Sequence, residues 1–127
     1  MTNPIRILVV DDEPDTLNLL QITLKPAGYI IESVMSGEEA IDRIRNDAYD
    51  LLLLDVMMPA MDGFDVIRTL QAESQPLPPF IFLTAKGREQ DIEIGSALGA
   101  AGYLVKPATR GNLLDAIQAA LPSHGDA

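Results

Sequence analysis

Cysteine is absent from the 127-residue sequence. Neither a disulfide framework nor thiolate chemistry is therefore open to this chain. Positive charge is scarce: 9 lysine and arginine residues stand against 19 aspartate and glutamate residues, and the net charge is −10. A chain so acidic repels nucleic acid and anionic membrane surfaces, and we expect it to bind neither of them directly.

Long apolar runs are missing as well. No stretch is long enough to cross a bilayer, and residues 1–6 lack the basic segment and apolar run of a signal peptide. We therefore expect a soluble, cytoplasmic protein. The composition, 47% hydrophobic and 22% charged, is globular. The length fits one domain over residues 1–127, with an ordered core at about 4–121 and a polar tail at 122–127.

Five short apolar runs, each closed by turn-forming residues, predict β-strands. They cover residues 5–10, 29–34, 50–54, 80–83 and 102–105. The second run contains Glu32 and Ser33, which is typical of an edge strand rather than a central one. The first, third and fourth are almost entirely apolar, as in strands that are buried on both faces.

The segments between these strands carry helical signals. Pro14 suits the first turn of one helix, and the acids around it suit its positive end. Ser36 and Glu39 match a capping box at the start of the next helix. Asp62 opens a third, and a weaker fourth helix is expected over residues 88–98, where no clean apolar stripe is present. A last helix has an apolar face that ends before the tail.

Strand and helix thus alternate five times. This alternation predicts an α/β fold of the (βα)5 type, a doubly wound, flavodoxin-like arrangement with a five-stranded parallel sheet and helices on both faces. We expect the strand order 2-1-3-4-5, which leaves the mixed-polarity second strand at an edge.

Polar residues follow four of the five predicted strands. Asp11 and Asp12 follow the first, Asp55 the third, Thr84 the fourth and Lys106 the fifth. In an open parallel sheet, ligands bind beyond the carboxyl ends of the strands, where the strand order reverses. We therefore expect these side chains to meet at one rim of the sheet.

The residue types in this set indicate phosphoryl chemistry with a metal ion. Clustered carboxylates are costly to ionise without a cation, and their hard oxygens suit Mg²⁺ or Mn²⁺. An aspartate such as Asp55 can attack phosphorus, while a lysine and a threonine can hold the phosphoryl oxygens. Each residue alone has an ordinary explanation, such as a solvated helix start or a surface lysine. Their joint placement favours a site.

These motifs together resemble response-regulator receiver domains, the phosphoacceptors of two-component signalling. The matching segments lie at residues 7–13, 50–63, 82–85 and 102–107, in the order that the family has them. One such segment alone is weak support, but four of them spread over nearly the whole chain are highly specific.

The resemblance implies a phosphoacceptor and a metal site. Asp55 would accept a phosphoryl group from the phosphohistidine of a sensor histidine kinase or a histidine phosphotransfer protein. The side chains of Asp12 and Asp55 and the main-chain carbonyl of Met57 would hold Mg²⁺, and Asp11 would act through a metal-bound water. The domain would catalyse only its own phosphorylation and dephosphorylation, so it would not be an enzyme with a free substrate.

The resemblance also implies a conformational switch. Thr84 and Lys106 would contact the phosphoryl oxygens, and the Lys106-Pro107 peptide bond would be cis. Tyr103 would turn inward when Thr84 moves towards the phosphoryl group. The surface of the fourth helix, fifth strand and fifth helix would then change its affinity for an output protein or domain, as a monomer or as a phosphorylation-dependent dimer.

Three local features concern partner choice and lifetime. Residues 99–102 read Gly-Ala-Ala-Gly, where the family often has acids, and Ala108 stands where a phenylalanine is common. Both lie near the expected output face, so they bear on the partner. Met57 and Lys86 each sit two residues beyond a site residue, and we hypothesise that they set the lifetime of the aspartyl phosphate.

Two other functions fit parts of the pattern. A small Mg²⁺-dependent phosphatase with an aspartyl-phosphate intermediate would usually place two acids as Asp-x-Asp after the first strand. Pro14 follows Asp11-Asp12-Glu13 here, which disfavours that enzyme. A flavin-binding module would need phosphate loops rich in glycine and hydroxyl groups at this position rather than carboxylates.

Overall fold

The computed structural model describes residues 4–122. The strands are β1 (Arg6–Val10), β2 (Ile30–Val34), β3 (Leu51–Leu54), β4 (Phe80–Thr84) and β5 (Gly102–Val105). The helices are α1 (Pro14–Leu24), α2 (Gly37–Asn46), α3 (Gly63–Ala72), α4 (Glu89–Ala97) and α5 (Arg110–Ala120), with a short 3-10 helix η1 (Lys25–Ala27) that was not predicted. Beyond Pro122, the predicted polar tail lies outside the described residues.

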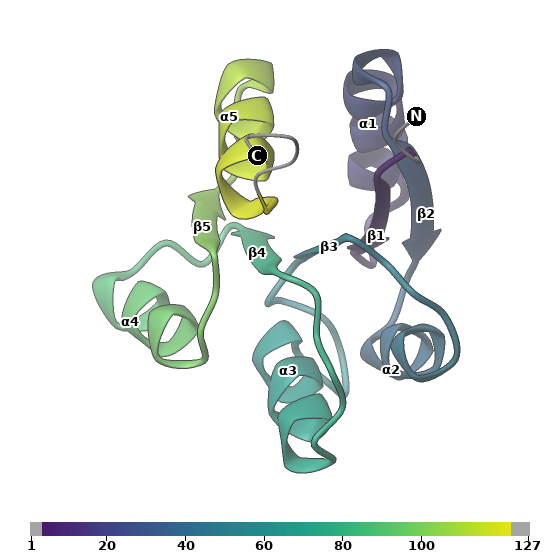
Figure 1. Cartoon of the computed structure of the whole chain (residues 1–127). Helices are drawn as coiled ribbons and strands as arrows, with labels where there is room; N and C mark the ends of the chain where they lie inside the picture. Colours follow the sequence, from purple (N-terminus) through teal and green to yellow (C-terminus); the bar gives the residue numbers. More distant parts are fainter. Residues whose placement is uncertain (1–3, 123–127) are drawn as a thin grey trace.

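All neighbouring strands are parallel, and their order is β2-β1-β3-β4-β5. The predicted α/β fold and strand order are therefore confirmed. Helices α1 and α5 cover one face of the sheet, and α2, α3 and α4 cover the other (Figure 1). In the part of the chain described, no helix is both long enough and apolar enough to span a membrane.

Each face of the sheet buries its own apolar cluster, because alternate strand residues point to opposite sides. Leu51 and Leu53 pack with α1 and α5, whereas Leu52 and Leu54 pack with α2 and α3. The run of four leucines thus serves both layers, which explains why this strand shows no alternation in sequence. A strand held on both sides is a rigid mount for the residue that follows it, Asp55.

The capping box that the sequence predicts at α2 is incomplete, and a complete one is present at α3. The Ser36 hydroxyl accepts from the Glu39 backbone N–H at 3.1 Å, but the Glu39 carboxylate accepts from that hydroxyl, so only half of the predicted capping box forms. A complete box forms instead at α3, where Asp62 and Asp65 each accept a backbone N–H from the other. Aspartate at the third helical position is shorter than the glutamate of the usual signature, so this box was missed.

Helix α4 is the least anchored of the five. It buries only Asp91 and Gly95, while Ile92 and Ile94 are exposed at 40% and 36%. The expected absence of an apolar stripe is confirmed. A helix with so little buried apolar surface gains little from packing against the sheet.

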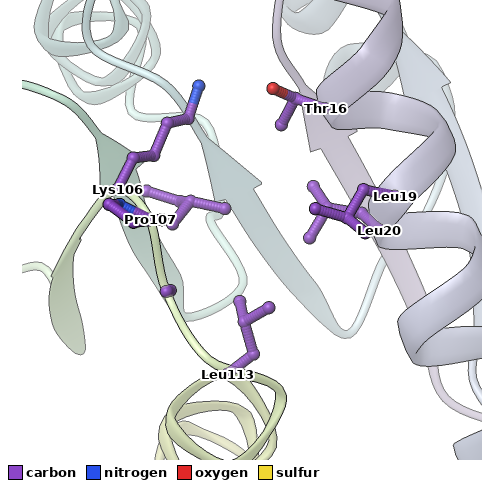
Figure 2. Close-up of a pocket in the computed structure, with 8 residues that line it drawn as sticks. Thr16, Leu19, Leu20, Lys106, Pro107 and Leu113 are labelled. Carbon is purple, nitrogen blue, oxygen red and sulfur yellow. The ribbon is translucent and has the colours of Figure 1, made fainter.

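Helices α1 and α5 leave an apolar groove between them. Thr16, Leu19 and Leu20 line it from α1, and Lys106, Pro107 and Leu113 line it from the opposite side (Figure 2). Leu19 is 60% exposed, which is high for a large apolar side chain beside a groove.

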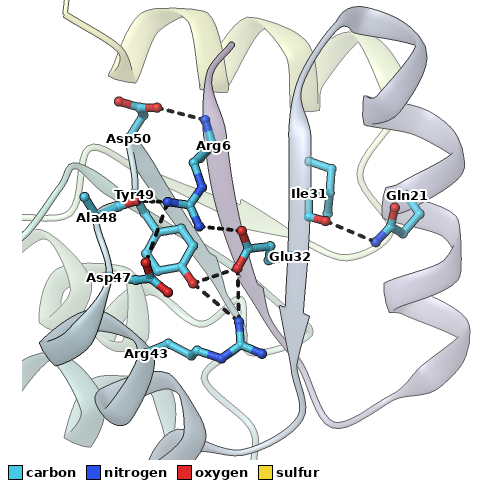
Figure 3. Close-up of polar contacts among 9 residues, drawn as sticks. All are labelled: Arg6, Gln21, Ile31, Glu32, Arg43, Asp47, Ala48, Tyr49 and Asp50. Atoms are coloured by element: carbon cyan, nitrogen blue, oxygen red, sulfur yellow. Dashed lines mark hydrogen bonds and ion pairs between the residues drawn. The ribbon is translucent and has the colours of Figure 1, made fainter. Parts of the chain in front are cut away.

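The edge strand β2 is tied to its neighbours by a polar network (Figure 3). The Glu32 carboxylate accepts from the Arg6 guanidinium at 2.5 Å, from the Tyr49 hydroxyl at 2.8 Å and from Arg43 at 3.1 Å. The bond from Arg6 holds the pKa of Glu32 below its usual range. The carboxylate that marked this strand as an edge therefore links β1, β2, α2 and the segment before β3.

Candidate functional site

Backbone hydrogen bonds of the sheet continue past the strand ends and set two carboxylates side by side. Val10 of β1 is in register with Leu54 of β3, and an aspartate follows each of them. The Asp55 N–H donates to the Val10 carbonyl at 2.9 Å, and the Asp11 N–H donates to the Val34 carbonyl at 3.1 Å. Asp55 is thus tied to the central strand β1, and Asp11 is tied to the edge strand β2.

Asp12 completes a group of three acids. One carboxylate oxygen from each of Asp11, Asp12 and Asp55 lies within 4.8 Å of the other two. Asp11 is 2% exposed and Asp55 is 4% exposed, so two of the three are withdrawn from water. Three hard oxygen donors at one buried point fit a divalent cation such as Mg²⁺, which would offset their mutual repulsion.

Lys106 faces two of these three acids. Its Nζ donates to Asp11 Oδ2 at 2.8 Å and to Asp55 Oδ2 at 3.2 Å. Burial alone would lower the pKa of Lys106, but the hydrogen bond to Asp11 and the charge of Asp55 outweigh it and hold the pKa above its usual range. The lysine therefore stays charged. The Lys106-Pro107 peptide bond is cis, as the resemblance implied.

Asp11 is the most buried of the three acids, and it has an acidic neighbour, Glu13, that the sequence analysis did not place in the site. Burial raises the pKa of Asp11, and the bond from Lys106 opposes this. Asp11 Oδ1 also accepts from the Glu13 N–H at 2.9 Å, and the Glu13 carboxylate lies 3.2 Å from Lys106 Nζ. The Asp-Asp-Glu run was visible in sequence, but only the fold turns its third acid back to the lysine.

The loop after β3 holds Asp55 from its other side. Asp55 Oδ1 accepts from the Met57 N–H at 3.0 Å. A Cβ on Gly63 would lie 2.2 Å from the Asp55 carbonyl oxygen, so only glycine fits there. A pocket beside this loop is lined by Val56, Met57, Met58, Asp62 and Lys86. Met57 is 51% exposed at its mouth.

Thr84 and Tyr103 meet at the backbone of one residue, Lys86. Thr84 is fully buried, and its hydroxyl accepts from the Lys86 N–H at 3.2 Å. The Tyr103 hydroxyl donates to the Lys86 carbonyl at 2.5 Å. Burial, followed by the charges of Asp91 and Asp55, raises the pKa of Tyr103 to about 12. The Thr84 hydroxyl thus contacts the β4–α4 loop, while the Lys106 N–H donates to the Thr84 carbonyl at 2.8 Å.

The chain has many relatives among characterised proteins. It is 41% identical over 102 residues to the alkaline phosphatase synthesis transcriptional regulatory protein PhoP of Bacillus subtilis, covering 80% of this chain and 42% of that protein. It is 39% identical over 101 residues to the response regulator SaeR of Staphylococcus aureus, covering 80% and 43%. The chain therefore spans less than half the length of these two curated relatives.

Solved structures and the family comparison agree. The chemotaxis protein CheY4 of Vibrio cholerae superposes with a TM-score of 0.86 at 32% identity, covering 94% of this chain and 100% of that one. These matches do not favour the phosphatase alternative, which already lacked its Asp-x-Asp signature. Residues 7–118 match the response regulator receiver domain family. The chain belongs to the response regulator receiver domain family, whose members are the phosphorylation-activated switches of two-component signalling.

Proposed function

We propose that the chain works as one receiver domain in which Asp55 is the phosphoacceptor. A carboxylate oxygen of Asp55 forms a bond to phosphorus, the phosphorus–nitrogen bond of a phosphohistidine breaks, and the histidine nitrogen keeps the electron pair and takes up a proton. The observation that carries this proposal is the convergence of Asp55, two further acids and Lys106 at one buried rim.

The other site residues would share the work of charge neutralisation. Lys106, held charged by its neighbours, would bind a phosphoryl oxygen, and the Thr84 hydroxyl, which accepts from the Lys86 N–H, would donate its own proton to another. Asp11, Asp12, Asp55 and the Met57 main-chain carbonyl would hold Mg²⁺ or Mn²⁺, which offsets negative charge on the phosphoryl oxygens when bound. These reactions concern the domain's own carboxylate, with no free substrate to turn over.

The donor would be a sensor histidine kinase or a histidine phosphotransfer protein. The groove between α1 and α5 would let such a donor dock beside the acceptor, because Lys106 lines this groove (Figure 2) and also bonds to Asp55. Exposed Leu19 and Ile22 on α1 offer apolar contact area for a helix of the donor.

The response would pass through Tyr103 to the face formed by α4, β5 and α5. Exposed Ile92, Ile94 and Val105 on this face could contact an output protein or domain, or a second copy after phosphorylation. The proposed output is protein contact rather than direct nucleic-acid binding, because the sequence carries a net charge of −10.

Phosphoramidate, which carries a phosphorus–nitrogen bond like phosphohistidine, tests the proposed chemistry without a partner. The protein is incubated with phosphoramidate and Mg²⁺, and its intact mass is measured with and without a chelator. We expect a single phosphoryl adduct that is much reduced by the chelator and by Asp12→Asn. No adduct on the wild type, or an adduct that forms equally well with the chelator, would contradict the proposal.

A further inference from the structure

Among residues 4–122, one buried acidic side chain lies outside the site described above. Asp91, in the first turn of α4, is 2% exposed, as deeply buried as Asp11. A carboxylate loses several kcal/mol of hydration on such burial unless charged or hydrogen-bonding groups replace the water. Helix α4 buries only one other residue, Gly95, so apolar packing does not explain why an acid occupies this position.

The partners of Asp91 both come from the loop between β4 and α4. The Arg88 Nε–H donates to Asp91 Oδ2 at 3.3 Å, and Lys86 Nζ lies 3.9 Å from Asp91 Oδ1. The Lys86 side chain is 39% exposed and that of Arg88 is 68% exposed, so both cations stay at the surface while the carboxylate that they contact is buried. Each cation engages a different carboxylate oxygen, and the pair of contacts spans the loop.

Lys86 therefore makes three contacts. Its side chain faces Asp91, its N–H donates to the Thr84 hydroxyl at 3.2 Å, and its carbonyl accepts the Tyr103 hydroxyl at 2.5 Å. The Lys86 carbonyl can accept the Tyr103 hydroxyl only while the β4–α4 loop keeps this conformation. Of these three contacts, only the one with Asp91 is independent of the switch residues Thr84 and Tyr103.

The ring of Tyr103 occupies a space that α4 leaves open. A Cβ on Gly95 would lie 2.9 Å from Tyr103 Cδ2 and 3.2 Å from Phe82 Cδ2. The Tyr103 and Phe82 ring centroids are 5.8 Å apart. The inward ring thus depends on where α4 lies, and Asp91 sits one helical turn before Gly95 on the same buried side.

We propose that Asp91 is a positioning residue of the switch: by pairing with Lys86 and Arg88, it holds the β4–α4 loop where the Lys86 carbonyl accepts the Tyr103 hydroxyl. Asp91 thereby sets the fraction of molecules with Tyr103 turned inward. The consequence for signalling rests on the proposed function, but the contact itself concerns the unphosphorylated chain.

The environment of the Tyr103 side chain can be measured directly by fluorine NMR. The protein is labelled with 3-fluorotyrosine, and the Tyr103 fluorine signal is assigned among the 3 tyrosines by Tyr103→Phe. Asp91→Asn keeps the shape of the side chain and removes its charge. We expect the signal to move towards that of an exposed tyrosine. The apparent pKa of the labelled Tyr103 should fall by about one unit or more relative to the labelled wild type, as burial and the Asp91 charge are lost.

Two further variants guard against a merely structural effect. Lys86→Met leaves Asp91 in place and removes its lysine, and we expect a smaller shift in the same direction. Glu89→Gln removes an equal charge from the same helical turn at an exposed position and should leave Tyr103 unchanged. The double variant Asp91→Asn/Lys86→Met should shift the signal by less than the sum of the two single shifts, because both act through one contact.

Two results would contradict the proposed role of Asp91. A Tyr103 signal that is unchanged in both Asp91→Asn and Lys86→Met would overturn the inference, as would an equal shift in Glu89→Gln. Phosphorylation of each variant by acetyl phosphate is measured in parallel by intact mass. A wild type that takes up no phosphoryl group would refute the proposed function while leaving the fluorine comparison to decide the role of Asp91.

Discussion

At the scale of single residues, one lysine balances three acids. Lys106 bonds to Asp11 and Asp55 and lies 3.2 Å from Glu13, and its side chain is only 18% exposed. Removing the cation from such a cluster leaves buried carboxylates uncompensated. This costs more stability than replacing the whole ion pair with apolar residues. The stability of the domain and the proposed phosphoryl transfer therefore involve the same ammonium group.

Lys106→Met tests this dependence, since methionine keeps much of the bulk. We expect the free energy of unfolding at neutral pH and without divalent cations to fall by about 3 kcal/mol. Added Mg²⁺ should recover more stability in the variant than it adds to the wild type, because the metal would then supply the missing positive charge. Urea unfolding with and without Mg²⁺ measures both effects. Lys25→Met, at an exposed position, is the control and should change little.

Two glycines make a matched pair for the loop that carries Asp55. A Cβ at Gly63 would meet the Asp55 carbonyl oxygen at 2.2 Å, whereas one at Gly111 meets nothing closer than the Thr109 hydroxyl at 4.0 Å. We expect Gly63→Ala to cost about 2 kcal/mol or more in unfolding free energy and to slow phosphorylation. Gly111→Ala, inside α5, should be neutral or stabilising by up to about 1 kcal/mol. Equal stability of the two variants would show that the close approach at Gly63 carries no strain.

At the scale of elements, the polar network on β2 shows how one acid can fix an edge strand. Because the bond from Arg6 lowers the pKa of Glu32, folding favours the ionised carboxylate. Its contribution is present above the unfolded pKa of about 4.3 and is lost as the pH falls through the lower folded value. The network should therefore stabilise the domain at neutral pH and not in strong acid.

Glu32→Gln removes this ionisable group. We expect a loss of about 1 kcal/mol at pH 7, which shrinks steadily as the pH is lowered below about 4. Thermal unfolding of both proteins across this pH range gives the difference directly. A difference that is constant with pH would mean that the amide loses packing or a neutral hydrogen bond rather than an ion pair.

The strands could be predicted from the sequence, whereas some helix ends could not. All five strands were predictable, because each apolar run is too short for a helix and is bounded by turn-forming residues. The capping box of α3 was missed because it uses aspartate where glutamate is usual, and η1 was missed because Pro26 reads as a stop rather than as a tight turn. Such details depend on local hydrogen bonds that composition does not encode.

At the scale of the whole molecule, the strand order brings distant residues together. Lys106 and Asp11 are 95 positions apart in sequence, yet their side chains bond at 2.8 Å. Parallel topology made this convergence predictable, since the residues that directly follow the strands all lie at the same rim. The neighbours Glu13 and Asp91 were not predictable, because neither follows a strand directly and each acquires its partner only through the path of a loop or helix.

Metal binding at the proposed site should raise the stability of the whole domain. A ligand that binds only the folded state stabilises it by about 2.7 kcal/mol at a concentration 100 times its dissociation constant. We expect the melting temperature to rise with Mg²⁺ in the wild type and much less in Asp12→Asn. Calorimetry in a series of Mg²⁺ concentrations, with Na⁺ at matched ionic strength as the control, measures this. Identical shifts in both proteins would place the cation elsewhere.

Intact mass spectrometry after incubation with acetyl phosphate and Mg²⁺ shows whether Asp55 receives the phosphoryl group. The wild type should gain one phosphoryl group that survives acid and is lost in base, as expected of an aspartyl phosphate. Asp55→Asn removes the nucleophile, keeps the side-chain shape and should gain none. An adduct of equal abundance in Asp55→Asn would contradict the assignment.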